Sequence, residues 1–233
     1  MKKITSVENS DNLLCPGGEV SCGRLNEIIR LRNEIDSLTE LVRTDALTGL
    51  YNFRFFKETI ALEMERTRRS TQPLSMILLD IDHFKKFNDK WGHETGNHAL
   101  VHVANLIKLA IRRLDIGCRF GGEEFVILLP NTDLRQAVSV AERLREMIES
   151  TAVEIDDCDE SIPLTASLGV DEFTSLKSET AEIFIHRVDA LLYQAKKLGR
   201  NRTVFPDSAM VPRTDAVSQE EKVALFGAVD NSQ

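Results

Sequence analysis

The sequence predicts an α+β fold in which helices pack on one mixed β-sheet. An apolar run at residues 74–82 has the length of a buried strand. A Gly-Gly pair at 121–122 joins two further strand-like runs, because glycine supplies the positive φ that a two-residue hairpin turn needs. Amphipathic helical stretches alternate with these strands. Since the hairpin makes the central strands antiparallel, the sheet is expected to be mixed and not doubly wound.

The elements follow one another from residue 53 onward. A helix is expected from Phe53 to about Ser70, followed by the strand LSMILLDID at 74–82. Apolar residues three and four apart indicate three more helices, centred on 100–111, 137–148 and 184–195. The other strands are expected at 117–120, 123–129, 164–173 and, at the sheet edge, 202–205.

A coiled-coil pattern precedes this domain. In the segment 23–43, apolar residues recur at alternating steps of three and four, at Ile28, Leu31, Ile35, Leu38 and Val42. This seam of about two heptads predicts a dimerising helical stalk, with an amphipathic helix lying on its own domain as the alternative. We expect a flexible leader at 1–22, the folded domain at 44–206 and a loose tail at 207–233.

The composition is typical of a soluble globular protein. Of 233 residues, 42% are hydrophobic and 28% are charged, which suits a sizeable core. With 29 Lys and Arg against 37 Asp and Glu, the net charge of −8 argues against nucleic-acid binding. No apolar run approaches the roughly 20 residues that cross a bilayer, and no signal-peptide core is visible. We therefore expect a cytoplasmic protein without membrane insertion.

Acidic residues occur twice where a predicted strand meets a turn. Asp80 and Asp82 end the first strand, and Glu123–Glu124 follow the glycine turn. If these elements are neighbours in the sheet, the carboxylates converge and need a hard cation such as Mg²⁺, which brings phosphate with it. A basic pair, Lys196 and Arg200, is spaced one helical turn apart. Together these residues indicate metal-assisted phosphoryl or nucleotidyl transfer.

Several motifs in this order resemble the GGDEF family of diguanylate cyclases. The hallmark is RFGGEEF at 119–125. It is accompanied by DALTGLYN at 45–52, DIDHFKKFND at 80–89, GHETGN at 92–97, ASLGV at 166–170 and YQAKKLGRN at 193–201. The resemblance covers about residues 44–206. It implies a ferredoxin-like, nucleotidyl-cyclase-type sheet and the condensation of two GTP into cyclic di-GMP, with release of two pyrophosphates.

The resemblance also implies a metal site. The Asp80 carboxylate and the Ile81 carbonyl would hold Mg²⁺, with Mn²⁺ as an alternative. Glu123 would be a further ligand and the catalytic acceptor of the 3′-hydroxyl proton, and Glu124 would assist a second metal ion.

Substrate-binding positions follow from the same resemblance: Asn88, His93, Asn97, Gly121, Gly122, Lys85, Lys196 and Arg200. Lys196 and Arg200 match a phosphate-gripping pair, with Lys85 as additional help, and Asn88 is expected to reach the guanine.

Asn97 departs from the family, which most often has Asp there. A carboxylate can accept from both guanine N–H groups, whereas an amide offers one acceptor and one NH₂ donor. GTP stays the favoured substrate, because the Asn97 oxygen and Asn88 can together satisfy a guanine edge. The alternatives are a cyclase of relaxed base specificity that makes a hybrid cyclic dinucleotide, and a nucleotide-binding signalling module without turnover.

A second site is implied by Arg112-Arg113-Leu114-Asp115, which has the family's RxxD inhibitory spacing. Arg112 can bind a phosphate or a guanine edge, Asp115 can accept from guanine, and Arg143 stands where the family has a second arginine. Feedback inhibition by cyclic di-GMP is the expected consequence.

The product also predicts a dimer. It is two-fold symmetric, and each domain supplies one GTP half-site, so two domains must face each other. We expect a homodimer held by the stalk, and a separate regulatory protein that grips the N-terminal helix. Three other residues are expected to be structural or surface residues: Cys118 in the core, and His98 and His102, which lack a third ligand nearby in sequence.

Overall fold

All eight residues of β1 (Leu74–Ile81) are buried, so this strand lies at the centre of the sheet. The coordinates are a computed structural model that describes residues 27–34, 43–155 and 158–207. The remaining elements of the domain are α2 (Phe53–Ser70), α3 (Phe84–Ala110), β2 (Ile116–Gly121), β3 (Glu124–Pro130), α4 (Leu134–Ser150), β4 (Val153–Ile155), β5 (Cys158–Ile162), β6 (Ala166–Phe173), α5 (Ala181–Lys197) and β7 (Thr203–Val204).

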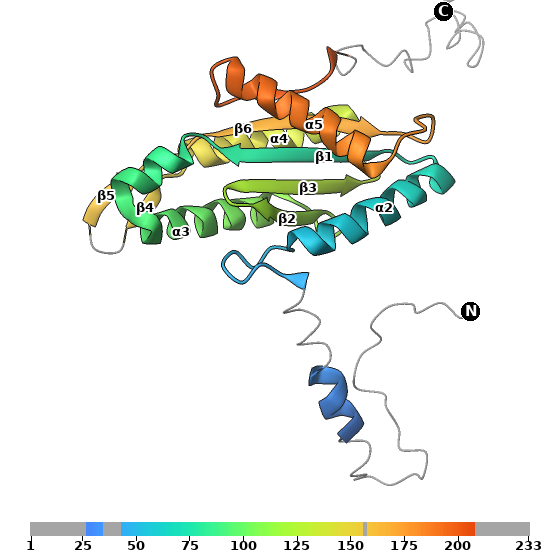
Figure 1. Cartoon of the computed structure of the whole chain (residues 1–233), viewed down its shortest axis with the longest axis horizontal. Coiled ribbons are helices and arrows are strands. Elements are labelled where there is room, and N and C mark those ends of the chain that lie inside the picture. The colour runs from blue at the N-terminus through green and yellow to red at the C-terminus, as the bar shows by residue number, and fades with distance from the viewer. Residues whose placement is uncertain (1–26, 35–42, 156–157, 208–233) are drawn as a thin grey trace, which may run out of the picture.

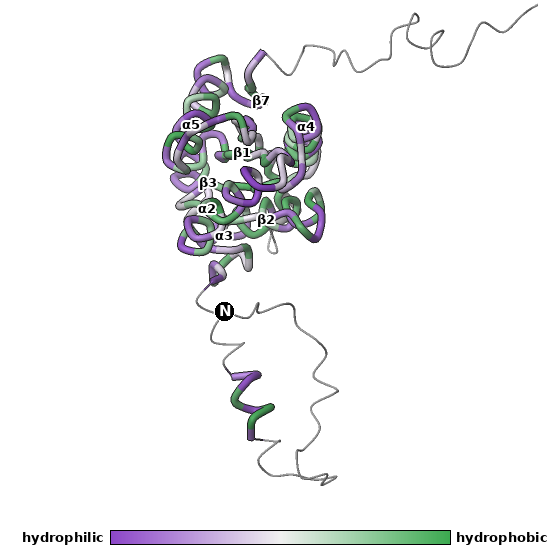
Figure 2. The backbone as a smooth tube through the Cα atoms, turned by 90° about the vertical axis from the view of Figure 1, so that its right-hand side faces the viewer, coloured by the Kyte–Doolittle hydropathy of each residue, from purple (hydrophilic) through white to green (hydrophobic). Residues whose placement is uncertain are grey.

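The main sheet has the strand order β2-β3-β1-β6-β7 (Figure 1). β1 is antiparallel to both β3 and β6, β2 is antiparallel to β3, and β7 pairs with β6 in parallel. Side chains of β1 alternate between two cores: Ile77 and Leu79 pack with α3 and α4, whereas Met76 and Leu78 pack with α2 and α5. In Figure 2, α4 and α5 lie on opposite sides of β1. This mixed α+β architecture confirms the fold class predicted from the sequence.

Local chemistry explains where the helices begin. α2 starts after Asn52, whose side chain accepts a hydrogen bond from the Phe55 N–H. Before α4, Asp133 and Gln136 form a reciprocal capping box. α3 is interrupted at Gly92, whose φ of 82° and ψ of 162° are not helical. Its first part therefore runs in a different direction from its longer second part.

The free edge of β2 is covered by the segment that leads into α2. Tyr51 forms a parallel bridge with Cys118. Its N–H donates to the Gly117 carbonyl at 3.1 Å, and the Arg119 N–H donates to its carbonyl at 2.8 Å. An edge strand is a template for unwanted pairing, and here the chain itself pairs with the middle of it. Burial raises the pKa of the Cys118 thiol to about 12, so this cysteine is the inert core residue that the sequence predicted.

Close packing of α5 on β6 depends on one glycine. A Cβ at Gly169 would lie 2.4 Å from the Leu192 nitrogen and 2.5 Å from the Val188 oxygen, both in the backbone of α5. Neither atom can move aside without moving the helix, so only glycine allows the helix this close to the sheet.

Two features differ from the sequence-based expectation. The hairpin of β4 and β5 was missed, because its sequence VEIDDCDESI is acidic and lacks an apolar alternation. The last helix ends at Lys197, so Arg200 lies in the turn beyond it and not one helical turn from Lys196. A positive φ of 114° at Gly199 and 65° at Arg200 breaks the helix there.

The N-terminal seam is described only in part. Residues 27–34 are helical, and Ile28 and Leu31 are 46% and 44% exposed. The seam residues Ile35, Leu38 and Val42, the leader at 1–22 and the tail at 208–233 lie outside the described residues. Across the described residues, no helix has the length and apolar character needed to cross a bilayer.

Candidate active site

The end of β1 and the turn of the β2–β3 hairpin lie side by side. Asp80 is the register partner of Glu124, and the Ile81 N–H donates to the Glu123 carbonyl at 3.4 Å. Gly122 has a φ of 49°, the left-handed conformation that the turn requires. The acidic residues that the sequence placed at two separate strand ends are therefore neighbours at one edge of the sheet.

The charges of this acidic cluster (Asp80, Glu123 and Glu124) oppose one another. Burial raises the pKa of Asp80, Lys196 lowers it, and the charges of Glu123 and Asp82 raise it again. Burial likewise raises the pKa of Glu124, and Asp80 adds to that increase. The Lys196 Nζ lies 2.7 Å from Asp80 Oδ2 and offsets part of the repulsion. A site built this way favours a ligand that brings positive charge.

Asp82 does not join the acidic cluster, although the sequence placed it beside Asp80. Its Oδ1 accepts from the Ser167 hydroxyl at 2.7 Å. Its Oδ2 accepts from the Thr165 hydroxyl at 2.8 Å and from the Asn201 backbone N–H at 3.0 Å. The side chain is buried among these donors, so its carboxylate is engaged inside the domain.

The acidic cluster supplies the donors that a hard divalent cation prefers: carboxylate oxygens and one backbone carbonyl, that of Ile81. The raised pKa of Asp80 and of Glu124 fits that chemistry, since the charge of a bound cation would offset the burial and the repulsion that raise both pKa values. Within the described residues, no three His, Cys, Asp or Glu side chains are already gathered as a ready-made metal cage. Lys196 contacts Asp80 in this arrangement, so a cation would have to share or replace that contact.

The predicted base-binding residues lie along the first part of α3 and just after its break. Asn88 Oδ1 is buried and has no hydrogen-bond partner among the residues that the structure describes. It lies against Gly96, where a Cβ would stand 1.9 Å from it. His93, Asn97 and Lys85 are exposed. An unpaired buried acceptor beside exposed polar groups is a feature of ligand sites, because such an atom is costly to leave unbonded.

The predicted phosphate-binding residues come from the end of α5. Lys196 reaches Asp80, and Arg200 follows in a turn where its N–H donates to the Ala195 carbonyl at 3.0 Å.

The hairpin glycines Gly121 and Gly122 are exposed, and apart from their chain neighbours no described atom lies within 4 Å of where their Cβ atoms would be. The hairpin turn thus presents bare backbone next to the acidic cluster.

The second predicted site is assembled around the end of α3. Asp115 Oδ2 accepts from the Arg112 backbone N–H at 2.7 Å, and the Asp115 N–H donates to the Arg112 carbonyl at 3.0 Å. Arg143 Nη2, from α4, donates to the Ala110 carbonyl at 2.5 Å. Burial raises the pKa of Asp115, against the lowering effect of the Arg112 backbone and charge. The structure thus brings these three residues to one place, at the opposite end of β2 from the acidic cluster.

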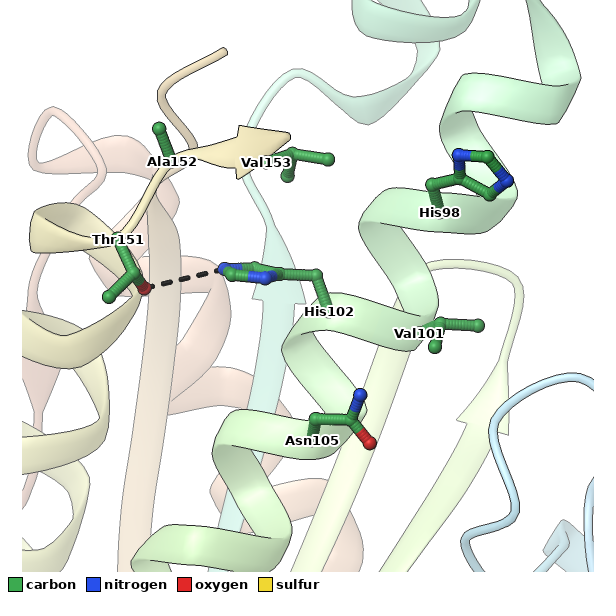
Figure 3. A pocket seen from close by; sticks show the side chains of 7 residues that line it. All are labelled: His98, Val101, His102, Asn105, Thr151, Ala152 and Val153. Atoms are coloured by element: carbon green, nitrogen blue, oxygen red, sulfur yellow. Dashed lines mark hydrogen bonds between the residues drawn. The ribbon is translucent and has the colours of Figure 1, made fainter. Parts of the chain in front are cut away.

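The histidine pair on α3 lies in a separate pocket of about 640 Å³ (Figure 3). His102 Nε2 lies 3.3 Å from Thr151 Oγ1, whereas the ring of His98 points in another direction. The two rings therefore diverge in this structure, and their role as structural or surface residues stays a prediction.

The comparison with known families settles which fold family this arrangement represents. The sequence profile described as "Diguanylate cyclase, GGDEF domain" matches residues 42–202. The chain belongs to this family. The match starts just before the turn that leads into α2 and ends at the residue before β7, so the GGDEF domain includes every element that carries the acidic cluster.

The curated relatives that match the GGDEF domain of this chain are longer proteins. The chain is 38% identical over 174 residues to the response regulator PleD of Caulobacter vibrioides, and 37% identical over 179 residues to the diguanylate cyclase VdcA of Vibrio cholerae. These alignments cover 75% and 76% of this chain. They cover 38% and 51% of those proteins, so the chain spans less than two thirds of these relatives.

Solved structures show the same fold. The coiled coil and GGDEF domain of DgcB from Caulobacter crescentus, in complex with c-di-GMP, has a TM-score of 0.74 and 29% identity. That match covers 78% of this chain and 95% of DgcB. The diguanylate cyclase SiaD from Pseudomonas aeruginosa, in complex with its activator SiaC, has a TM-score of 0.68 and 37% identity. It covers 78% of this chain and 72% of SiaD.

Sequence reasoning assigned no role to Arg119 of the GGDEF domain. Its Nε and Nη2 donate to the Gly122 carbonyl at 3.0 and 2.8 Å, and its Nη1 lies 3.3 Å from Asp45. Arg119 therefore ties the hairpin turn to the start of the domain. Both partners lie in motifs that the sequence displays, but nothing in the spacing of those motifs indicates that they touch.

Proposed function

We propose that this chain is a diguanylate cyclase, which condenses two GTP into cyclic di-GMP and releases two pyrophosphates. The observation that carries the proposal is the meeting of Asp80, Glu123 and Glu124 at the adjoining ends of β1 and β3, with Lys196 beside them. Carboxylates held close together can bind a metal ion, and the exposed glycine backbone beside them leaves room for the nucleotide that the ion accompanies. Membership in the GGDEF family supports the same reaction.

The proposed cofactor is Mg²⁺, with Mn²⁺ as the alternative, held by Asp80, the Ile81 carbonyl, Glu123 and Glu124. Bound there, the ion would neutralise triphosphate charge and make the ribose 3′-hydroxyl more acidic. Glu123 is also the proposed acceptor of the proton of that hydroxyl, as the resemblance to the family implies, since a carboxylate held beside the ion can act as a general base.

The proposed substrate contacts divide by chemistry. Lys196 and Arg200, with Lys85, would bind the phosphates, and the exposed Gly121–Gly122 backbone would let the nucleotide approach closely. Asn88 Oδ1, buried and unpaired, would accept from a guanine N–H. The exposed His93 and Asn97 would complete the base site.

The proposed active form is a homodimer, because one GGDEF domain supplies one half of a two-fold symmetric product. The exposed apolar residues Ile28 and Leu31 on a helical segment support pairing through the stalk. The same helix is the proposed contact for an activating protein, and that a protein activator can bind a cyclase of this fold is supported by the solved complex of SiaD with its activator SiaC.

The proposed feedback site is formed by Arg112, Asp115 and Arg143, which lie together at the far end of β2. Cyclic di-GMP offers phosphates and guanine edges that an arginine fork and a carboxylate recognise. Binding there would slow turnover without occupying the acidic cluster.

The test is product analysis with the full chain, GTP and Mg²⁺. Release of pyrophosphate with formation of cyclic di-GMP supports the cyclase. Binding of GTP without either product, at a protein concentration high enough for dimers, would instead support a signalling module without turnover.

A cyclase that makes a hybrid dinucleotide is the second candidate, because Asn97 presents an amide where guanine recognition favours a carboxylate. Incubation with equal GTP and ATP separates the two. We expect cyclic di-GMP as the main product, and a further rise in guanine preference in Asn97→Asp. A mainly hybrid product would contradict the assignment to GTP alone.

A further inference from the structure

Two aspartates that stand two residues apart have different surroundings. Asp80, the last but one residue of β1, faces the acidic cluster and Lys196. Asp82, just beyond the strand, is 7% exposed and its carboxylate accepts three hydrogen bonds, two from hydroxyls on the β6 side and one from a backbone N–H. That backbone N–H belongs to Asn201, the residue after Arg200.

The turn that Asp82 holds is conformationally unusual. Arg200 and Asn201 have φ values of 65° and 46°, so two consecutive residues other than glycine adopt the left-handed conformation. Such conformations are sparsely populated and persist only where the surroundings enforce them. Such conformations also occur often at functional sites, where a rigid backbone holds a side chain in a defined position.

The surroundings enforce this turn from three elements. Asp82, after β1, accepts from the Asn201 N–H at 3.0 Å. From α4, Glu149 Oε1 accepts from Asn201 Nδ2 at 2.8 Å, and Arg145 Nη1 donates to Asn201 Oδ1 at 3.1 Å. Arg145 and Glu149 are themselves paired at 2.7 Å. The Arg202 carbonyl accepts from the Leu168 N–H of β6 at 2.9 Å.

We propose that Asp82 is a positioning residue for the triphosphate of GTP: by fixing the Asn201 backbone, it sets the point from which Arg200 reaches the phosphates. The inference rests on the proposed cyclase function, and it assigns the two aspartates separate tasks. Asp80 binds metal, whereas Asp82 acts through Arg200 and binds neither metal nor nucleotide. Because Ser167, Thr165 and Asn201 already occupy its oxygens, Asp82 has little capacity left for a cation.

The test is a double-mutant cycle between Asp82→Asn and Arg200→Ala, read out as the dissociation constant of a non-hydrolysable GTP analogue with Mg²⁺. We expect Asp82→Asn to weaken binding about tenfold, the loss that one misplaced charge-assisted contact produces. In the Arg200→Ala background, the same change should weaken binding no further, because residues that act through one another are not additive. The Mg²⁺ concentration for half-maximal activity should not change.

Asp171→Asn is the matched control, because Asp171 is also a buried aspartate near β1, but it pairs with Arg187 and Lys177 away from Arg200. It should lower the melting temperature and leave analogue binding unchanged. Asn201→Ala, which removes the contacts with Glu149 and Arg145, should reproduce the Arg200-dependent loss and serves if Asp82→Asn fails to fold.

Equal weakening by Asp82→Asn with and without Arg200 would overturn the proposal, as would a raised Mg²⁺ requirement. Analogue binding does not depend on turnover, so the two proposals can fail separately. A wild-type chain that makes no cyclic di-GMP contradicts the cyclase, whereas additive losses in an active enzyme contradict only the role of Asp82.

Discussion

The two candidate ligand sites lie at opposite ends of β2 and differ in what surrounds their carboxylates. At the acidic cluster, burial and mutual repulsion raise the pKa of Asp80 and Glu124, with Lys196 as a partial counter-charge. At the other end, Asp115 accepts from a backbone N–H and Arg143 donates to a backbone carbonyl. The first site gains most from a ligand that brings cations, whereas the second is held in shape by neutral groups before any ligand arrives.

Glu123→Gln is the substitution expected to have the largest effect on this comparison. It keeps the shape of the side chain and removes one negative charge and the proposed proton acceptor. We expect cyclic di-GMP formation to fall by at least about 100-fold, because the metal and the nucleophile both lose a partner. The rate is measured as pyrophosphate release. Turnover within a few-fold of wild type would contradict the placement of the chemistry at this turn.

Lys196→Met removes the counter-charge from the acidic cluster. Lys196 lowers the pKa of Asp80, so without it that pKa should rise and more protons should compete with the metal at neutral pH. We expect kcat/KM to fall roughly 10- to 100-fold. The acid limb of the pH–rate profile should move to higher pH, with partial recovery under alkaline conditions. A lower rate with an unshifted limb would show that Lys196 acts on phosphate alone.

Arg112→Ala tests the site at the other end of β2. We expect the cyclic di-GMP concentration for half-inhibition to rise about tenfold or more, because a charge-assisted fork to phosphate is lost. The initial rate without product should stay at the wild-type value. Arg113→Ala is a matched control, since it is an exposed neighbour with no assigned role. Equal effects of the two substitutions would argue for a nonspecific loss of positive charge.

Glu124→Gln is expected to have the smallest effect, a slight change in melting temperature whose direction tests the charge repulsion in the acidic cluster. Burial raises the pKa of Glu124, so its ionised form opposes folding above that pKa and the opposition disappears as pH falls through it. The variant should therefore melt at a slightly higher temperature than wild type at neutral pH, and at the same temperature in acid. Thermal unfolding across pH measures this difference. A lower melting temperature at neutral pH would contradict the charge repulsion inferred for the acidic cluster.

The sequence predicted those parts of the fold that depend on the burial of apolar side chains. The limits of α2 and the existence of the hairpin were correct, because periodicity and turn glycines report burial and backbone conformation directly. The turn itself lies one residue later than predicted, at Gly122 and Glu123, because Gly121 still pairs with Glu124 as the last residue of β2. The adjacency of Asp80 and Glu124 was predicted from the same features and confirmed.

The direction of a polar side chain beyond the end of an element could not be predicted. In a strand, residues two apart share a face, so Asp80 and Asp82 were expected to act together. β1 ends at Ile81, however, and Asp82 is free to turn toward β6. Similarly, the spacing of Lys196 and Arg200 suggested one helical turn, whereas tertiary hydrogen bonds to Asn201 hold Arg200 in a turn with a positive φ, which its own residue type does not favour.

The absence of a side chain at Gly169 also has a consequence for the acidic cluster. A methyl group at this position would clash with the backbone of α5 and move the helix away from the sheet. Lys196 lies on that helix, so a displacement of α5 would also move Lys196 relative to Asp80, which it contacts at 2.7 Å. Gly169→Ala should thus lower the proposed cyclase activity, measured as pyrophosphate release, without altering any residue of the acidic cluster.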